Sequence, residues 1–419
     1  MFSGTNRSYP VFDINEEKNI LKKAILRRTR DAHRHAIRWV MLSGLAFTST
    51  PGMAQEGDST HLADFSPVTD SSPPAGTSGS GTFTKHKNGF LALPVVYYRP
   101  ETKLAFGGVG IYYFRPPNSL PETRASSIRA GLIYTTASQI IAKIEPQVFL
   151  EDEKYFVSGD VSFFKFPDKF YGIGNSTPSA AEEDYVPQIF RFRAGFEYQF
   201  LPRLFGGILY NFYNYRILEY AEGGELMQGT IPGSGGGKLS GVGLSLKWDT
   251  RDNVFDASRG AYFLVTAVTF QRFLGSEFSY TNYKVDLRKY FSIIPGQHLA
   301  IQFYGGFMAG EPPFQFLQRL GGEKLMRGYR EGRYSDRNYM LLQGEYRLHV
   351  YWRFGAVVFA GIGDVSSRIG NFRLPEFKPT YGFGFRFAVS EEERLNIRLD
   401  FGFGQPGNSG FYLTASEAF

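Results

Sequence analysis

The chain has 419 residues and no Cys, and 17% of its residues are aromatic, with 41 Phe, 26 Tyr and 48 Gly. Its formal net charge is +6, but residues 1–38 hold nine Lys and Arg against four Asp and Glu, so only +1 remains for the rest and nucleic acid is not an expected partner. No stretch after residue 50 approaches the roughly 18 apolar residues of a membrane helix, which excludes a membrane-spanning helix bundle.

The N-terminal residues have the order of properties that export requires. Residues 1–38 are basic, residues 40–47 form a short apolar core, and small residues precede Gln55. This order predicts a signal peptide over residues 1–54, with an amphipathic membrane-surface helix as the alternative. Residues 55–88 are rich in Ser, Thr, Gly and Pro and lack an apolar period, which predicts a disordered linker. The linker is too short to hold a folded periplasmic domain of useful size.

From residue 89 onward, the chain is divided into short segments that alternate between apolar and polar positions. In residues 395–401, for example, apolar side chains alternate with Asn396, Arg398 and Asp400. This period is typical of an all-β fold, and the number of segments predicts a transmembrane, 16-stranded antiparallel β-barrel over residues 89–419. The expected strands are residues 90–99, 103–114, 124–136, 139–151, 153–166, 188–200, 203–216, 238–249, 260–272, 278–291, 297–309, 338–349, 353–364, 378–389, 394–404 and 409–419.

The lengths of the connections favour the outer membrane over a soluble sheet with one wet face. The long connections, residues 167–187, 217–237, 310–337 and 365–377, all follow odd-numbered strands, whereas many that follow even-numbered strands are short. Long loops on one rim and tight turns on the other are typical of outer-membrane barrels. An even number of strands also places both ends of the barrel on the side of the tight turns.

Motifs for enzymes and cofactors are absent or out of context. Residues 402–407 match the dinucleotide pattern, but they connect two strands and open no helix. Residues 233–238 resemble a phosphate loop only in their glycines. No serine-hydrolase or zinc-protease motif follows the linker. We therefore expect no catalytic residue, no cofactor and no metal site.

Three motifs in the second half of the barrel occur in an order that carries a family resemblance. The loop before the twelfth strand contains Leu325, Met326, Arg327, Gly328 and Tyr329. The turn between the eighth and ninth strands contains Asp249, Arg251, Asp252, Asn253 and Gly260. The thirteenth strand contains Phe359, Gly361 and Gly363. Together they resemble the bacterial surface antigen family, the barrel domain of outer-membrane protein insertases and two-partner secretion translocases.

The resemblance implies that the sixth surface loop folds into the lumen, where Arg327 binds charged residues of the inner wall. A confined guanidinium needs a bidentate partner, and the neighbouring glycine permits a tight turn. In the family an acid on the thirteenth strand often supplies that partner, but Gly361 occupies the matching position here. Asp364 has the opposite parity and is expected to face outward. We therefore predict that Glu345, on the inner face of the twelfth strand, binds Arg327.

The end of the chain also resembles a known signal. Phe411, Leu413 and Phe419 have one parity, and a terminal aromatic on an alternating last strand resembles the recognition signal of bacterial outer-membrane barrels. The first strand contains Pro94, and glycines precede the last strand, so the junction between the two strands is expected to open easily.

The resemblance implies a function at the outer membrane of a Gram-negative bacterium. We predict a non-enzymatic barrel that assists assembly or transport of polypeptides, with outer-membrane lipid and unfolded client polypeptides as partners. The chain shows no polypeptide-transport-associated domains, so a separate periplasmic protein is expected to deliver the client. The alternatives are a passive channel or porin, and a structural or adhesive surface antigen.

Overall fold

The computed structural model describes all residues except 1–88, 100–102, 117–125, 137, 391–393 and 416. The predicted signal peptide and linker therefore lie outside the described residues. The long strands are β1 (Gly89–Arg99), β2 (Lys103–Phe114), β3 (Ser126–Thr135), β4 (Ile140–Leu150), β5 (Tyr155–Lys165), β7 (Glu183–Leu201), β8 (Leu204–Tyr220), β9 (Gly237–Asp249), β10 (Gly260–Phe270), β11 (Tyr280–Ile294), β12 (Gln297–Gly310), β15 (Asn338–Tyr351), β16 (Phe354–Ser366), β17 (Lys378–Ser390), β18 (Leu395–Phe403) and β19 (Ser409–Ala415).

Shorter elements lie in the surface loops. The short strands are β6 (Asp168–Phe170), β13 (Gln318–Leu320) and β14 (Tyr334–Asp336). The 3-10 helices are η3 (Ser179–Ala181), η4 (Arg272–Leu274), η5 (Phe314–Phe316), η6 (Ile369–Asn371) and η7 (Leu374–Glu376). In the described part of the chain, no helix is long and apolar enough to cross a membrane.

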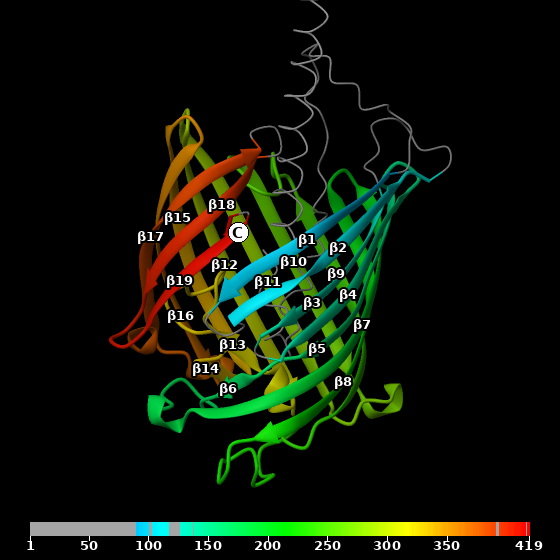
Figure 1. Cartoon of the computed structure of the whole chain (residues 1–419), viewed down its shortest axis with the longest axis vertical. Helices are drawn as coiled ribbons and strands as arrows, with labels where there is room; N and C mark the ends of the chain where they lie inside the picture. The colour runs from blue at the N-terminus through cyan, green and yellow to red at the C-terminus, as the bar shows by residue number, and fades with distance from the viewer. Residues whose placement is uncertain (1–88, 100–102, 117–125, 137, 391–393, 416) are drawn as a thin grey trace, which may run out of the picture.

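Each long strand pairs antiparallel with its neighbour in sequence, from β1 with β2 through to β18 with β19. Figure 1 shows the resulting curved wall, with β1 and β19 both on the near side. The prediction of sixteen strands is confirmed. Among the described strands, no pairing joins β1 to β19, so each has one edge without a strand partner.

The alternation read from the sequence is the reason that these strands form a barrel. On β9, Val242, Leu244 and Trp248 face outward and are 42%, 65% and 43% exposed, while Ser245 faces inward and is buried. In lipid every backbone N–H and C=O must be bonded, so the strands form one continuous ladder. The outer face supplies apolar side chains to the bilayer, and the inner face keeps the polar ones.

Two strand ends differ from the prediction. The hairpin of β7 and β8 is taller than expected, with strands of 19 and 17 residues, and β6 pairs with the added residues of β7. The last strand is shorter, with only seven residues, and it ends at Ala415 instead of Phe419. The wall is therefore high at β7 and β8 and low beside the unpaired edge of β19.

Three long surface loops pack together over one end of the barrel. Phe170 and Leu226, from the first two loops, form one buried cluster with Phe314 and Leu317 of the loop between β12 and β15. The backbone N–H of Phe314 also donates to the carbonyl of Pro232 at 2.9 Å. These loops therefore pack against one another at the end opposite the tight turns.

Candidate functional site

The sixth surface loop, residues 311–337, is folded into the lumen. It begins with Pro312 and Pro313, continues through η5, and then forms a small ladder in which β13 pairs with β14. Its side chains are buried among those of the wall, in a cluster that joins Leu320, Met326 and Tyr329 to residues of β12, β15 and β16. The inward position expected for this loop agrees with the structure.

Arg327 is the most enclosed charge of the loop. Its Nη1 donates to Oδ2 of Asp400 on β18 at 2.6 Å, and its Nη2 lies 3.4 Å from Oε1 of Glu345 on β15. The guanidinium also lies over the ring of Phe359 on β16, with 3.5 Å between its carbon and the ring centroid. Thr380 on β17 donates its hydroxyl to the carbonyl of Arg327. Four consecutive wall strands therefore bind one residue.

The structure brings Arg327 and Glu345 together, as predicted, but Asp400 makes the shorter contact. Sequence reasoning placed Asp400 on the inner face of its strand and did not select it. Asp400 also accepts a hydrogen bond from Nη1 of Arg386 at 2.6 Å. Glu345 is buried and makes no hydrogen bond through either oxygen, although Arg347 lies 3.7 Å away. The stronger acceptor in this site is therefore Asp400.

The residues on either side of Arg327 have specific places in the wall. Gly328 has a φ of +106°, and its N–H donates to the hydroxyl of Tyr412 on β19 at 2.9 Å. The hydroxyl of Tyr329 donates to the carbonyl of Pro379 on β17 at 2.9 Å and accepts the N–H of Gln405 at 2.8 Å. The loop tip is thus attached to strands on both sides of β18.

Close packing against glycines makes this docking sensitive to size. A Cβ on Gly402 of β18 would lie 2.6 Å from the backbone carbon of Arg327 and from the nitrogen of Gly328. Neither backbone atom can move independently of the loop. Gly402→Ala is therefore expected to destabilise the docked loop by about 1–3 kcal/mol. Limited trypsin digestion of the folded barrel should then cleave the loop about tenfold faster or more.

Gly344→Ala is the matched control for that substitution. Gly344 lies on β15, and a Cβ there would come no nearer than 3.6 Å to the carbonyl oxygen of Ala300. We expect this variant to be digested at the wild-type rate. Equal digestion rates for Gly402→Ala and Gly344→Ala would contradict the docking argument.

The thirteenth-strand motif, on β16, forms the floor under the loop. Phe359 stacks on Arg327 as described, and a Cβ on Gly363 would lie 3.1 Å from the sulfur of Met326. A Cβ on Gly361 would lie 2.8 Å from the Cβ of Gln343, so the acid that the family often carries there would collide with this neighbour. The motif therefore supplies an aromatic ring and two closely packed glycines in place of a carboxylate.

Asp364 corrects an expectation. It was expected to face outward, but it is buried and accepts a hydrogen bond from Nζ of Lys378 at 2.7 Å. β15 still pairs with β16 at Asp364, but β17 pairs with β16 only as far as Gly363, so on the β17 side Asp364 is covered by Lys378 and a surface loop. Asn175, in another surface loop, also donates to it at 3.0 Å.

The residues of the turn motif between β9 and β10 bind one another and do not contact Arg327. Asp252 accepts the backbone N–H groups of Ser258 and Arg259, and Arg251 binds Asp249 through two hydrogen bonds. Asn253 accepts the N–H groups of Phe255 and Asp256. Gly260 has a φ of +105°, where a Cβ would lie 2.2 Å from the carbonyl oxygen of Thr250. These contacts give the motif a structural role at the rim of tight turns.

The same turn meets the end of the chain. Asp256 lies 3.2 Å from Nη1 of Arg347, the residue that also approaches Glu345, and the carbonyl of Phe255 accepts the N–H of Glu417. Glu417 accepts Nε of Arg386 at 2.7 Å. A chain of alternating charges therefore connects the turn, the C-terminal residues and the pocket of Arg327.

The C-terminal residues correct the prediction of a single apolar face. Phe411 and Leu413 face outward and are 60% and 59% exposed, as expected. Phe419, in contrast, is buried against Tyr290 and Ala300 of the inner wall, and Nη2 of Arg347 donates to its carbonyl. A strand that continued past Ala415 would have placed Glu417 on the lipid face, which is costly. The chain turns inward instead, where Glu417 binds Arg386.

The contact between Asp256 and Arg347 should be sensitive to pH. Burial, followed by the charge of Glu417, raises the pKa of Asp256 to about 6. A raised carboxyl pKa means that the folded state holds the proton more tightly than the unfolded state does. Protonated Asp256 therefore stabilises the fold at low pH, and this stabilisation is lost as pH rises towards about 6. Asp256→Asn is therefore expected to gain stability relative to the wild type across that range.

Thermal unfolding of the two proteins between acidic and neutral pH tests this expectation. The side chain of Asp256 is 25% exposed, so solvent will reduce the size of the effect. Asp184→Asn, at an exposed carboxylate on β7, serves as the control. A difference between Asp256→Asn and the wild type that falls as pH rises would contradict the assignment.

A second set of contacts, which sequence reasoning missed, holds the outer part of the sixth loop. Nη2 of Arg319 on β13 donates to Oδ2 of Asp168 on β6 at 2.9 Å, and the hydroxyl of Tyr185 donates to the same oxygen at 3.0 Å. Nη2 of Arg333 donates to the carbonyl of Thr177 at 2.8 Å. We call the contact between Asp168 and Arg319 the outer clamp.

The described residues form no group of three or more His, Asp or Glu side chains that could hold a metal ion. The arrangement of the lumen is instead that of a positioned loop. Its chemistry consists of arginines, carboxylates and aromatic rings that bind one another.

Comparison with solved structures places the barrel among proteins of known fold. BamA from Haemophilus ducreyi, lacking POTRA domains 1–3, matches with a TM-score of 0.54 and 11% sequence identity over 79% of this chain and 70% of that chain. CdiB from Acinetobacter baumannii matches with a TM-score of 0.51 and 12% identity over 78% of this chain. This chain covers only 59% of CdiB. At these identities the likeness shows the fold.

Comparison with curated proteins finds none that matches. A family model does match, and it covers residues 148–419, from the end of β4 through the sixth loop to the last residue. It is described as the Omp85 superfamily domain and accounts for more than half of the chain. The family expectation is confirmed, and with it an outer-membrane location. The chain belongs to the Omp85 superfamily of Gram-negative outer-membrane β-barrels.

Proposed function

We propose that this barrel assists the assembly of polypeptides at the outer membrane and does so without enzymatic chemistry. The observation that carries the proposal is the pair of strand edges at β1 and β19, which have no pairing with each other in the described strands. A free edge presents N–H and C=O groups that an incoming strand can bond, and this is the physical basis of strand addition.

The ends of the barrel wall support the same function. β19 has seven residues and β1 has eleven, so the wall is low at the edge of β19. Among the described strands, β18 alone pairs with β19, over the seven residues from Ile397 to Phe403. A short ladder has few hydrogen bonds to break, and it separates more easily than the long ladder between β7 and β8.

The contacts of the loops in and over the lumen support insertion over passive transport. The sixth loop is bound inside the barrel by Arg327, and the outer loops pack over the same end through Phe170, Leu226 and Phe314. A passive channel would require an open path through these contacts. Outer-membrane lipid and unfolded client polypeptides are the partners that fit this proposal. A separate periplasmic protein would deliver the client.

The test is to join the two edges covalently. The chain has no Cys, so Leu413→Cys on β19 can be combined with one Cys on β1 and joined by a bifunctional maleimide. The purified barrel in liposomes is then mixed with a urea-unfolded small outer-membrane barrel as client. We expect the joined protein to insert the client about tenfold more slowly or worse, since the edges can no longer bond it.

The matched control joins two strands that are already paired. Phe106 on β2 lies opposite Tyr134 on β3, and both side chains face outward, so Phe106→Cys with Tyr134→Cys can be joined in the same way. This lock should leave client insertion unchanged. Full activity of the protein joined at β1 and β19 would show that insertion does not use this edge.

A further inference from the structure

Arg386 on β17 connects the end of the chain to the anchor of the sixth loop. Its Nε donates to Oε2 of Glu417 at 2.7 Å, and its Nη1 donates to Oδ1 of Asp400 at 2.6 Å. The other oxygen of Asp400 accepts the hydrogen bond from Arg327 of the loop. One guanidinium therefore binds both the carboxylate of Glu417 and the carboxylate that holds the loop.

Arg347 on β15 makes a second connection of the same kind. Its Nη2 donates to the carbonyl of Phe419 at 2.8 Å and lies 3.7 Å from Oε1 of Glu345. The same oxygen of Glu345 lies 3.4 Å from Nη2 of Arg327. In the part of the chain that the structure describes, neither Glu417 nor Phe419 bonds to the loop. The two arginines of the wall therefore provide the connection.

β19 itself is bonded to the tip of the loop. The hydroxyl of Tyr412 accepts the N–H of Gly328 at 2.9 Å. Arg398 on β18 donates Nε to the hydroxyl of Thr414 at 2.8 Å and Nη2 to the carbonyl of Glu323 at 3.1 Å. The strand with the unpaired edge and the residues that follow it are therefore both connected to the loop.

The charged side chains at this place form one buried group, which we call the shared charge group. All of its members are 6% exposed or less. Asp256 reaches Arg347 from the rim, but its side chain is 25% exposed. A buried charge that loses its counter-charge is costly. The arginines of the group are Arg327, Arg347, Arg386 and Arg398, and its carboxylates are Glu345, Asp400 and Glu417.

The loop is the part of the group that can leave the wall. Three of the four arginines lie on β15, β17 and β18, whose ladders fix their backbone. Arg327, in contrast, lies on the loop. If Glu417 left the inner wall, the four arginines would share only Glu345 and Asp400 within the group. Undocking of Arg327 would relieve the repulsion among them.

We propose that Glu417 is a positioning residue for the sixth loop. Its carboxylate keeps the loop tip docked through Arg386 and Asp400, and the tip is released when the chain end leaves the inner wall. Because Glu417 follows closely on β19, whose outer side has no strand partner among the described strands, movement of this edge reaches the loop. The inference goes beyond the proposed function, since it concerns the barrel alone and applies with or without a client.

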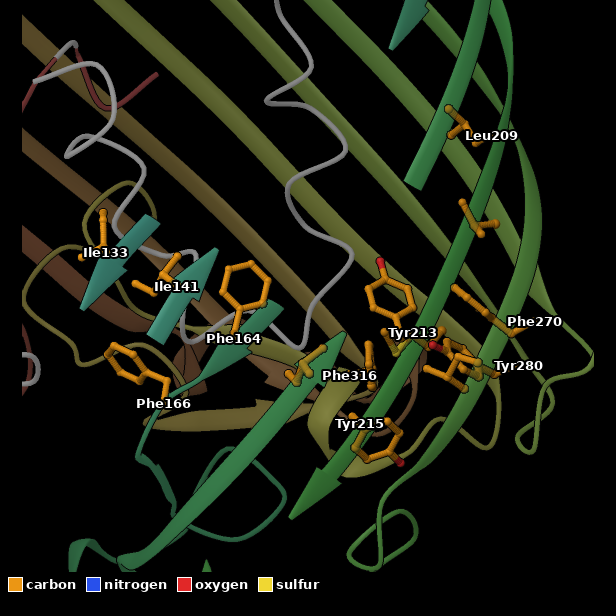
Figure 2. Close-up of a cluster of buried hydrophobic side chains, with 14 of the residues drawn as sticks. Ile133, Ile141, Phe164, Phe166, Leu209, Tyr213, Tyr215, Phe270, Tyr280 and Phe316 are labelled. Carbon is orange, nitrogen blue, oxygen red and sulfur yellow. The ribbon is translucent and has the colours of Figure 1, made fainter. Parts of the chain in front are cut away.

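The release should be limited to the tip, because the beginning of the loop is held by aromatic rings. The ring of Phe316 in η5 lies 4.9 Å from that of Tyr213 and 5.3 Å from that of Tyr215, both on β8, measured between centroids. Figure 2 shows these three side chains within one buried cluster. Packing of uncharged rings does not depend on the charge of Glu417. Residues 314–317 therefore serve as an internal reference.

Hydrogen exchange of the purified barrel in neutral detergent, followed by mass spectrometry, tests the proposal with Glu417→Gln. Gln keeps the shape of the side chain and removes its charge. We expect the backbone N–H groups of residues 323–329 to exchange at least about fivefold faster than in the wild type, which is the lower end of typical coupling between sites. Exchange at residues 314–317 should be unchanged.

Glu197→Gln is the matched control. Glu197 is a buried carboxylate on the inner face of β7, and it forms an ion pair with Lys247 on β9. This variant also removes one buried negative charge from the inner wall, but outside the shared charge group. Residues 323–329 should exchange at the wild-type rate in Glu197→Gln.

A second substitution separates a role of charge from a merely structural role. Glu417→Gln combined with Arg386→Gln removes one charge of each sign, so the group regains the net charge of the wild type. We expect exchange at residues 323–329 to return towards the wild-type rate. If Glu417 and Arg386 only supported the packing of the wall, the double variant would exchange at least as fast as Glu417→Gln.

Coupling between two sites is reciprocal, which provides a test that does not require Glu417→Gln to fold. Arg327→Ala should accelerate exchange in the C-terminal peptide from residue 411 onward. An unchanged rate in that peptide would overturn the proposal. So would wild-type exchange of the loop tip in Glu417→Gln, equal acceleration by Glu197→Gln, or faster exchange in the double variant than in Glu417→Gln.

Discussion

Replacing Arg327 by Ala is expected to remove most of the client-insertion activity in the liposome assay. The side chain is buried and binds Asp400 and Glu345, and removing one partner of a buried charge pair typically costs about 3–5 kcal/mol. The loop tip would then lose its connection to β15 and β18, and the lumen would no longer have one defined shape. Trypsin sensitivity of the loop should rise together with the loss of activity.

A double-mutant cycle shows whether these residues act as a unit. Arg327→Ala combined with Asp400→Ala should be less harmful than the sum of the two single variants, with a coupling of about 1–3 kcal/mol. The same holds for Arg327→Ala with Glu345→Ala. Arg337→Ala, at an exposed arginine of the same loop, is the control and should behave as the wild type. Fully independent effects would refute the pairing.

The two acids are not expected to be equivalent. Asp400 accepts two hydrogen bonds of 2.6 Å, from Arg327 and Arg386, whereas Glu345 approaches its arginines without a hydrogen bond. Charge-assisted hydrogen bonds are the stronger contacts. Asp400→Ala should therefore be the more harmful substitution of the two.

Sequence alternation was sufficient to predict the sixteen strands and, in residues 395–401, that Asn396, Arg398 and Asp400 share one face, which is buried. It could not supply the register between strands, and the register decides which inward acid lies under Arg327. Glu345 is opposite Phe359, which is opposite Gly382, which is opposite Gly402. Asp400 lies one inward position from Gly402 on the same strand, so it borders the same space. The alternation along each strand limited the candidates to acids that face inward. The pairing register between strands was needed to show which of them lies beside Arg327.

The contacts of the surface loops and of the C-terminus could not be predicted from the sequence for a different reason. Asp168 and Arg319 are 151 positions apart in the sequence, and neither lies in a segment with an apolar period. No local signal could have joined them. At the C-terminus, in contrast, the sequence does contain a local signal for the turn. Glu417 broke the apolar face of the last strand, and the cost of placing its charge against lipid is the reason that the chain turns inward.

Breaking the outer clamp is expected to open the lumen without removing the anchor at Arg327. Asp168 is buried and binds Arg319 at 2.9 Å, and Tyr185 donates to the same carboxylate oxygen. Asp168→Ala would remove the carboxylate that pairs with Arg319 and accepts from Tyr185, at a cost of about 3–5 kcal/mol. The outer half of the sixth loop would then detach from β6, while Arg327 kept its contacts with Asp400.

Conductance of the purified barrel in planar bilayers measures this effect. If the outer clamp keeps the lumen closed, Asp168→Ala should increase the fraction of time for which the barrel conducts by a factor of at least about 100. This factor corresponds to a loss of about 3 kcal/mol in the stability of the closed state. Lys169→Ala is the control, because Lys169 is the adjacent residue and forms its ion pairs at the surface with Glu182 and Asp184. Unchanged conductance in Asp168→Ala would mean that the anchor at Arg327 alone holds the loop. The two sets of contacts would then be successive layers of one plug, with the inner layer dominant.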